Sequence, residues 1–252
     1  MKLGRQWDER LKIWDEAFED NLYTRLGEIS LSGFTTMAHL SLEQAAGQDF
    51  QPFPVGTGWG AKWEYGWFRG EVTLPGEAAG KRILLYLGPG PEMLVFVNGV
   101  ESGSIDRQHH YVELTACATP GEHFVVYAEC YGGHGARRED GGIWGRTDVP
   151  VPEPVGPQCK VESSHYGIFQ GEMAAVYADY HTLYDLWKAM PERDLRTMKI
   201  GEALQQFTYV ADFETPWPQR IQGILEGDKL LRPLLEKKNG DTVPVYSTFG
   251  QS

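Results

Sequence analysis

Carboxylate pairs are the first chemistry to look for, because many hydrolases use one carboxyl group as an acid and a second as a base or nucleophile. The chain contains 35 Asp and Glu residues, so the count alone singles out no pair. The segment Ser102-Gly103-Ser104 does not fit the Gly-x-Ser-x-Gly turn that carries a nucleophilic serine. No phosphate-binding glycine loop or dinucleotide fingerprint is present. We therefore predict no catalytic residue in this sequence.

Two groups of residues could be considered as metal ligands. One is His109-His110, and the other consists of Glu129, Cys130 and His134. Neighbouring residues on a strand point to opposite faces, so neither adjacent pair is expected to share an ion. His134 lies in a Gly-rich segment, and no spacing matches a known ligand set. We predict no metal site and no cofactor within the chain.

Aromatic residues near the middle of the chain form a third candidate site. Trp59, Trp63 and Trp67 could stack on the apolar face of a sugar, and they are the candidate carbohydrate-binding residues. Trp63, Tyr65 and Trp67 would share one face of an extended strand. Such alternation is more often used to fill the core of a β-sandwich, and we favour that interpretation.

The elements that would position these residues change in type along the chain. Trp7, Leu11, Trp14, Phe18 and Leu22 follow helical spacing, which predicts an amphipathic helix over residues 6–26. Its polar face is mainly acidic, unlike that of a membrane-surface helix. We expect its apolar stripe to dock on a large surface.

Short β-branched and aromatic runs follow the predicted helix, separated by Gly, Pro and Asn. Residues 67–74, 83–87, 93–97 and 123–131 read as strands, and Asn98-Gly99 is a strong hairpin turn. Several short strands at this spacing predict an antiparallel β-sandwich.

Helical patterns return towards the end of the chain. We expect Asp179, Asp194 and Thr215-Pro216 to begin three helices, with Pro233 inside the third and Asn239-Gly240 at its end. The organisation we predict is an N-terminal helix in 1–28, a sandwich in 29–135, a connecting loop and strand in 136–178, a helical segment in 179–240, and a strand in 241–252. The predicted fold class is α+β, mainly β with helices.

Composition excludes several classes of function. The net charge of −12 offers no basic surface for nucleic acid. No apolar run approaches the roughly 20 residues that span a bilayer, and residues 1–16 carry charges throughout, without the apolar stretch of a secretory signal. Three widely spaced cysteines do not suggest a disulfide framework. We predict a cytoplasmic protein without nucleic-acid or membrane partners.

The order of several motifs resembles the N-terminal region of cytosolic-type family 38 α-mannosidases. Two blocks carry the resemblance, a jelly-roll block and a following helical block that β-galactosidase and β-glucuronidase sugar-binding domains lack. The first contains Trp59-Gly60, Trp67-Phe68-Arg69, Leu74-Pro75, Val97-Asn98-Gly99, Asp106 and Leu114, and the second contains Leu183-Tyr184-Asp185-Leu186, Leu234-Leu235-Glu236 and Phe249-Gly250-Gln251-Ser252.

The resemblance implies a jelly-roll, galactose-binding-like sandwich in a parent enzyme that hydrolyses terminal α-mannosides with retention and uses zinc. In that family a His-Ile-Asp zinc motif follows the Gly-Gln-Ser position, and it is absent here. We therefore expect an inactive structural and assembly segment. Its expected partners are the parent's catalytic barrel, with 241–252 as the first barrel strand, and other copies of the enzyme.

Two alternatives remain open from the sequence. The sandwich could be a freestanding carbohydrate-binding module, or it could belong to an enzyme of the β-galactosidase or β-glucuronidase type. A catalytic role for the charged loop 132–146, which contains Arg137, Arg138, Glu139 and Asp140, is a further interpretation. We also expect the isolated chain to self-associate through helix faces that the barrel would cover.

Overall fold

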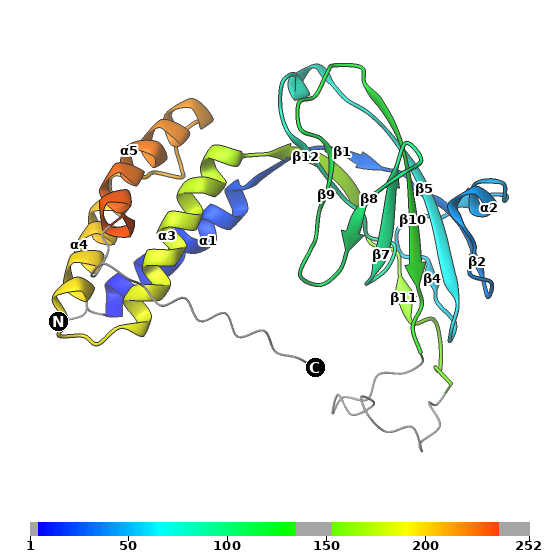
Figure 1. Ribbon diagram of the computed structural model, residues 1–252, viewed down its shortest axis with the longest axis horizontal. Coiled ribbons are helices and arrows are strands. Elements are labelled where there is room, and N and C mark those ends of the chain that lie inside the picture. Colours follow the sequence, from blue (N-terminus) through cyan, green and yellow to red (C-terminus); the bar gives the residue numbers. More distant parts are fainter. Residues whose placement is uncertain (1–4, 135–152, 237–252) are drawn as a thin grey trace. The chain divides into compact units, whose positions relative to one another are not determined.

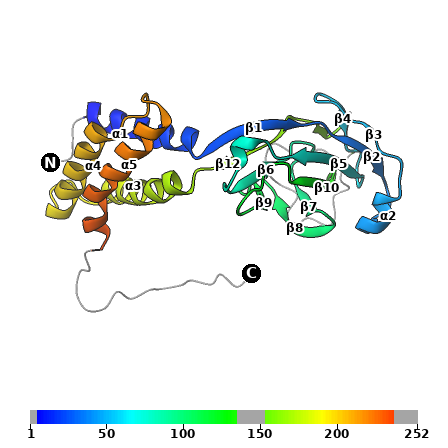
Figure 2. The same cartoon turned by 90° about the horizontal axis from the view of Figure 1, so that it is seen from above.

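A computed structural model describes residues 5–134 and 153–236 of the chain. These residues form two compact units. The jelly-roll unit comprises Thr24–Phe169, and the helical unit combines residues from the two ends of the sequence, of which 5–23 and 170–236 are described. Figure 1 shows the strands gathered in the first unit and the long helices in the second, and Figure 2 shows the same elements from above.

The jelly-roll unit is built from two main antiparallel sheets. The six-stranded sheet has the order β3-β2-β5-β10-β7-β8, and the four-stranded sheet has the order β1-β12-β6-β9. A short pair, β4 (Gly58–Trp59) and β11 (Cys159–Lys160), lies beside them. The remaining bounds are β1 Tyr23–Ile29, β2 Ser32–Thr36, α2 Leu42–Ala46, β3 Gln51–Pro52, β5 Tyr65–Thr73, η1 Gly76–Ala78, β6 Ile83–Tyr86, β7 Met93–Val97, β8 Val100–Ile105, β9 Val112–Thr115, β10 His123–Tyr131 and β12 Ser164–Phe169.

Alternation along β10 separates the core from the outer face of the six-stranded sheet. Phe124, Val126, Ala128 and Cys130 are buried and belong to the sandwich core. The residues between them point away from this core, because successive side chains on a strand face opposite sides. The predicted strand 123–131 and the predicted antiparallel sandwich are both confirmed.

The hairpin between β7 and β8 is also confirmed. Asn98 and Gly99 adopt φ values of 50° and 82°, the positive values that a two-residue turn of this type requires. The side-chain oxygen of Asn98 also accepts a hydrogen bond from the backbone N–H of Val125 at 2.8 Å. The turn is thereby joined to the neighbouring strand β10.

The helical unit contains α1 (Arg5–Asn21), α3 (Gly171–Ala189), α4 (Leu195–Val210) and α5 (Trp217–Leu235). Leu11 and Phe18 of α1 are completely buried in a core shared with Tyr180 and Phe207. The expected apolar stripe of the first helix therefore packs on helices from the other end of the sequence. Phe18 lies 5.0–5.8 Å, centroid to centroid, from the rings of Tyr177, Tyr180, Phe207 and Phe213.

Two expectations about helix boundaries were wrong, one at the end of α1 and one at the start of α3. The first helix ends at Asn21 instead of residue 26, because the chain then extends into β1, which joins the four-stranded sheet. Asp179 does not begin a helix, since α3 starts at Gly171 and passes through it. Residues 171–178 contain several good helix formers and continue the helix towards its N-terminus.

Expected starts for the last two helices had different outcomes. Asp194 is confirmed as the N-cap of α4, where its carboxylate accepts from the N–H groups of Arg196 and Thr197. Thr215 does not cap α5, because Pro216 occupies that position and the Thr215 hydroxyl donates to the Asp212 carbonyl. Pro233 lies inside α5 as predicted.

The expected strand at 241–252, the helix end at Asn239-Gly240 and residues 135–146 of the charged loop lie outside the described residues. Among the helices that the structure describes, none is both long enough and apolar enough to cross a membrane. The strand β12, which falls in the segment 136–178, pairs with β6 and lies inside the jelly-roll unit.

Candidate functional site

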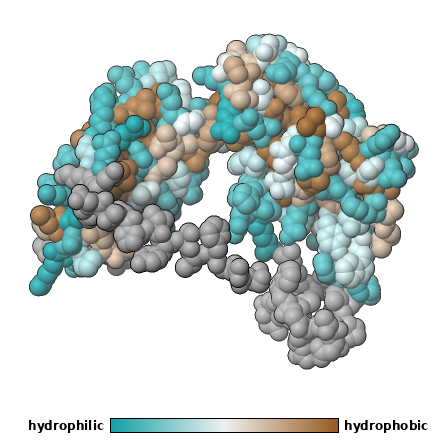
Figure 3. Space-filling model, in the orientation of Figure 1, coloured by the Kyte–Doolittle hydropathy of each residue, from teal (hydrophilic) through white to brown (hydrophobic). Residues whose placement is uncertain are grey.

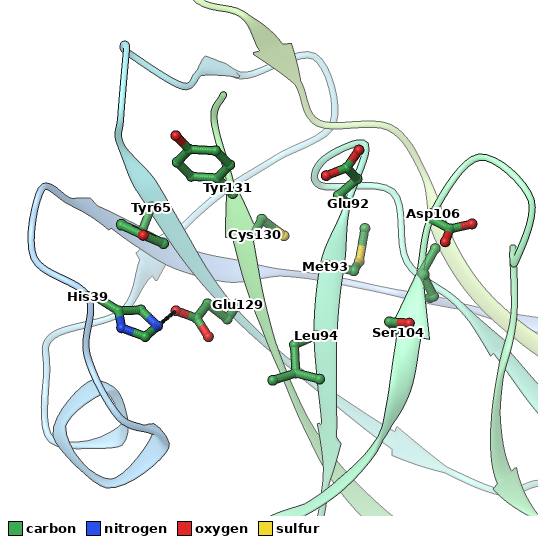
Figure 4. A pocket seen from close by; sticks show the side chains of 11 residues that line it. His39, Tyr65, Glu92, Met93, Leu94, Ser104, Asp106, Glu129, Cys130 and Tyr131 are labelled. Atoms are coloured by element: carbon green, nitrogen blue, oxygen red, sulfur yellow. Dashed lines mark ion pairs between the residues drawn. The ribbon is translucent and has the colours of Figure 1, made fainter. Parts of the chain in front are cut away.

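A groove of about 420 Å³ crosses the outer face of the six-stranded sheet, and we call it the outer groove. Four adjacent strands, β5, β10, β7 and β8, supply its floor, and the segment before α2 supplies one wall (Figure 4). The volume lies within the range of about 300–1,000 Å³ that is usual for small-molecule sites. The lining residues are His39, Tyr65, Glu92, Met93, Leu94, Ser104, Ile105, Asp106, Glu129, Cys130 and Tyr131.

Aromatic rings form a continuous row that leads into the outer groove. Trp63 lies 4.7 Å from His134, centroid to centroid, and His134 lies 5.5 Å from Tyr131. Tyr131 is in turn 5.3 Å from Tyr65, which is 5.3 Å from His39. We call these five rings the aromatic row. Tyr65 and Tyr131 are in register on β5 and β10, so strand pairing itself places their rings side by side.

The carboxylate of Glu129 is the most buried charge in the outer groove. Its side chain is 14% exposed, and its Oε1 lies 3.2 Å from His39 Nε2 as an ion pair (Figure 4). Burial raises the pKa of Glu129, while the charge of His39 opposes this rise. The ion pair lacks hydrogen-bonding geometry, and no residue in the described ranges donates a hydrogen bond to Glu129 Oε1.

Trp67 faces Glu129 across the β5–β10 pair. The two residues are in register, so both side chains stand on the outer face of the sheet. Trp67 is completely buried, its ring stacks at 6.0 Å on Phe96, and its indole N–H finds no acceptor among residues 5–134 and 153–236. A buried donor and a buried acceptor, neither hydrogen-bonded to any described residue, therefore lie on adjacent strands. Native proteins leave few such groups unsatisfied.

Asp106 sits at the far end of the outer groove, just after β8. Its carboxylate accepts from the backbone N–H groups of Gln108 and His109, both at 2.7 Å, and contacts the His109 ring at 3.1 Å. These hydrogen bonds lower the pKa of Asp106 to about 2. Asp106 therefore remains an anion throughout the neutral range.

The three Trp residues singled out in the sequence occupy different environments. Trp59 is buried in the sandwich core, and its indole N–H donates to the Pro89 carbonyl at 2.6 Å. Trp67 is buried on the opposite face of its sheet, whereas Trp63 is 45% exposed. The expectation that Trp63, Tyr65 and Trp67 share a strand face was wrong for Trp63, because β5 begins only at Tyr65. The favoured interpretation that this face fills the sandwich core was also wrong, because Tyr65 and Trp67 stand on the outer face of the sheet.

The backbone explains why Trp63 stands apart from the strand. Its φ is 66°, a left-handed value that bulky residues rarely adopt. Two hydrogen bonds hold this conformation: Trp63 N–H donates to the Gly133 carbonyl at 2.9 Å, and Gly132 N–H donates to the Glu64 carbonyl at 2.7 Å. Strained conformations of this kind persist only where the surroundings enforce them, and they are frequent at functional sites.

The candidate metal ligands are separated by the fold. Cys130 points into the sandwich core, where burial raises the pKa of its thiol well above the ordinary value, while Glu129 points to the outer face. His109 is held by Asp106 in a local turn, and His134 belongs to the aromatic row. Among the described residues, no three His, Cys, Asp or Glu side chains come together as ligands. These residues do not fit a zinc ion.

A second groove of about 540 Å³ lies at the turn between β4 and β5. Two of its lining residues form an ion pair, in which Lys62 Nζ lies 2.8 Å from Glu153 Oε1. Trp59 contributes to its base, although only 4% of this side chain is exposed. The wall beyond this ion pair consists largely of Pro154, Gly156 and Pro157 and their neighbours. This groove offers fewer rings and hydroxyls than the outer groove.

Comparison with known families identifies the fold. Residues 27–158 match the family described as "Alpha-mannosidase, jelly roll domain". The chain belongs to this family. The match covers the jelly-roll unit from β1 to the end of the connection before β11, and it confirms the resemblance drawn from Trp67-Phe68-Arg69 and Val97-Asn98-Gly99.

Two curated relatives carry the name Alpha-mannosidase 2C1. The mouse protein is 23% identical over 194 residues and the human protein 24% over 192 residues, which is 75% and 74% of this chain. In each case the matched region is 18% of the relative, so this α-mannosidase jelly-roll chain spans about a fifth of their length.

The solved structures to which this chain shows some similarity include glycosidases. A β-glucuronidase from Ruminococcus gnavus gives a TM-score of 0.40 at 15% identity, covering 59% of this chain and 29% of that chain. A putative β-galactosidase from Bacteroides fragilis gives 0.38 at 15% identity, covering 58% and 23%.

Sequence reasoning missed most of the outer groove in this α-mannosidase domain. His39 and Tyr131 were not singled out, Ser104 was considered only in a segment that does not fit a nucleophile turn, and Glu129 was considered only as a metal ligand. One usable pattern existed: Tyr127, Glu129 and Tyr131 alternate on the side of β10 that does not face the core. Their meeting with residues of β5, β7 and β8 depends on strand order and register, which the sequence does not state.

Proposed function

We propose that this chain is a non-catalytic segment of an α-mannosidase, with a structural and assembly role in an enzyme that hydrolyses terminal α-mannosides with retention. The match of residues 27–158 to the α-mannosidase jelly-roll family carries this proposal. The extent of the relatives supports it, because this chain corresponds to only 18% of their length. The catalytic groups would then lie in other parts of the enzyme.

The zinc expected for the parent enzyme belongs, in this proposal, to residues outside this sequence. The described part of the chain offers no set of three ligand side chains. No step of the hydrolysis is therefore assigned to residues of this chain. The role that remains for them is to fold and to pack against the rest of the enzyme.

Hydrolysis of an aryl α-mannoside tests this proposal directly. The 252-residue chain should show no turnover of 4-nitrophenyl α-D-mannopyranoside above the buffer rate, with or without added zinc, while circular dichroism reports folded protein. Metal-dependent turnover that persists through repurification would overturn the proposal. It would mean that a zinc site exists within these residues.

The helical unit is the proposed assembly surface. Leu195, Met198 and Tyr209 on α4 are 64%, 49% and 60% exposed. On the face seen in Figure 3, apolar and polar residues are mixed over this unit. In a cytoplasmic parent enzyme, we propose that a catalytic barrel or another copy covers such side chains. Light scattering should detect self-association of the isolated chain, and a monodisperse, salt-insensitive monomer would contradict this part of the proposal.

A further inference from the structure

We propose that the outer groove binds a neutral pyranoside, whose ring stacks on Tyr65 and Tyr131 while its hydroxyls bond to Glu129. The inference goes beyond a structural role, because it gives the jelly-roll unit a ligand of its own. The groove lies on the sheet face opposite the sandwich core, so packing of the fold does not account for its polar lining.

Hydrogen bonding favours a hydroxylated ligand. Glu129 lines the groove, and its Oε1 is paired with His39 at 3.2 Å but receives no hydrogen bond from the described residues. A hydroxyl group both donates and accepts, so a ligand hydroxyl can donate to the Glu129 carboxylate and accept from a neighbouring hydroxyl of the groove. Ser104 and the phenol groups of Tyr65 and Tyr131 offer further donors and acceptors along the groove.

The aromatic row favours a ring-shaped ligand over an open polyol. Tyr65 and Tyr131 line the groove with ring centroids 5.3 Å apart, and the row continues through His134 to the exposed ring of Trp63. The C–H face of a pyranose is apolar and flat enough to lie on such rings, whereas a linear polyol has no comparable face. The extent of the row also provides room for more than one sugar ring.

A cation is the main competing ligand, since Glu92, Asp106 and Glu129 bring negative charge to the outer groove. Two of these charges already have partners. Asp106 accepts hydrogen bonds from two backbone N–H groups, and Glu129 forms an ion pair with His39. An ammonium ion can only donate, so it would leave the hydroxyl donors of Tyr65, Ser104 and Tyr131 without an acceptor. The donors on the groove wall therefore favour the neutral ligand.

Chemical-shift titration of the isotope-labelled full chain tests the inference. Methyl α-D-mannopyranoside is the first probe, a choice that rests on the proposed function, and methyl glucoside and galactoside follow. We expect a Kd on the order of 1 mM for a single ring in an open groove. The Tyr65, Tyr131 and Glu129 amides, which belong to residues lining the groove, should shift together.

Matched variants assign the binding to the outer groove. Glu129→Gln should weaken binding roughly tenfold by removing a charge-assisted hydrogen bond, and Tyr131→Ala should weaken it roughly fivefold. Glu113→Gln and Tyr111→Ala change an exposed carboxylate and a 41% exposed ring outside the outer groove, and both should bind as the unaltered chain does. Equal weakening by Glu129→Gln and Glu113→Gln would overturn the assignment.

The other outcomes separate this inference from the proposed function. Binding of a glucoside or galactoside without binding of the mannoside would support the groove and count against the proposed substrate class. Equal binding of sorbitol would overturn the stacking argument. No shift with any pyranoside, or shifts only with tetramethylammonium, would overturn the inference. Well-dispersed resonances in the spectrum of the ligand-free chain would show that misfolding is not the cause.

Discussion

Asp179 on α3 and Asp228 on α5 place their carboxyl groups against each other inside the helical unit, with Arg232 beside both. Asp228 is 4% exposed, and its Oδ2 lies 2.5 Å from Arg232 Nε, while Asp179 Oδ2 lies 3.6 Å from the same atom. Burial raises the pKa of Asp179 above 3.8, and the charge and hydrogen bond of Asp228 raise it further, against the opposing charge of Arg232. Two carboxyl groups thus share one arginine.

This arrangement makes the stability of the helical unit depend on pH. A raised pKa means that the folded chain holds a proton that the unfolded chain has released. The free energy of unfolding should therefore fall as pH rises from about 3.8 through the raised pKa of Asp179. Asp179→Asn removes this ionisation and gives Asp228 an amide donor. The variant should be more stable at pH 7 by about 1 kcal/mol, and the gain should disappear at pH below about 3.8.

Thermal unfolding followed by circular dichroism at several pH values measures this effect. Asp185→Asn is the matched control on the same helix, because a hydrogen bond from Lys188 lowers the pKa of Asp185. That substitution should not stabilise the chain at neutral pH. A gain from Asp179→Asn that persists unchanged at acid pH would rule out the shared ionisation as its cause.

Phe18 tests whether α1 is an integral part of the helical unit. Its ring is fully buried and contacts four other rings, so Phe18→Ala should cost about 3–5 kcal/mol. Ile13→Ala removes a 57% exposed side chain from the same helix and should change stability by less than about 0.5 kcal/mol. Helix unfolding monitored by circular dichroism distinguishes the two. Equal and small effects would mean that α1 does not pack on α3 and α4.

The close approach of Gly132 to the turn before β5 gives a third prediction. A Cβ at this position would lie 2.9 Å from Gly60 Cα and 3.0 Å from the carbonyl oxygens of Ala61 and Glu64. Backbone atoms surround the site, so Gly132→Ala should destabilise the jelly-roll unit by about 1–3 kcal/mol. Gly76→Ala meets nothing within 4 Å and is the control. Chemical denaturation should separate the variants, and similar midpoints would contradict the close packing.

Local sequence patterns predicted the strands and turns of this protein better than they predicted its outer groove. The alternation in β10 and the turn at Asn98-Gly99 depend on residues adjacent in sequence, and both were read correctly. The pairing of Trp67 with Glu129 joins residues 62 positions apart, through a register that no local pattern encodes. The start of α3 was missed for a related reason, because Asp179 has the chemistry of an N-cap but lies inside α3 and meets Asp228 of α5.

A substitution at Trp63 should change the stability of the chain and its ligand binding in opposite directions. Its φ of 66° is unfavourable for a bulky residue, and its ring is 45% exposed, so packing returns only part of the conformational cost. Trp63→Gly should therefore raise the free energy of unfolding by about 1 kcal/mol, since glycine adopts positive φ without strain.

The same substitution removes the outer end of the aromatic row. A disaccharide that reaches from the outer groove onto Trp63 and His134 should bind less tightly, whereas a monosaccharide held by Tyr65, Tyr131 and Glu129 should bind unchanged. Calorimetric unfolding and a paired titration with methyl α-mannoside and an α-mannobioside measure both effects. A less stable variant would show that the Trp63 ring contributes more through packing than its backbone costs. Equal loss for both ligands would place the monosaccharide at Trp63 instead of in the outer groove.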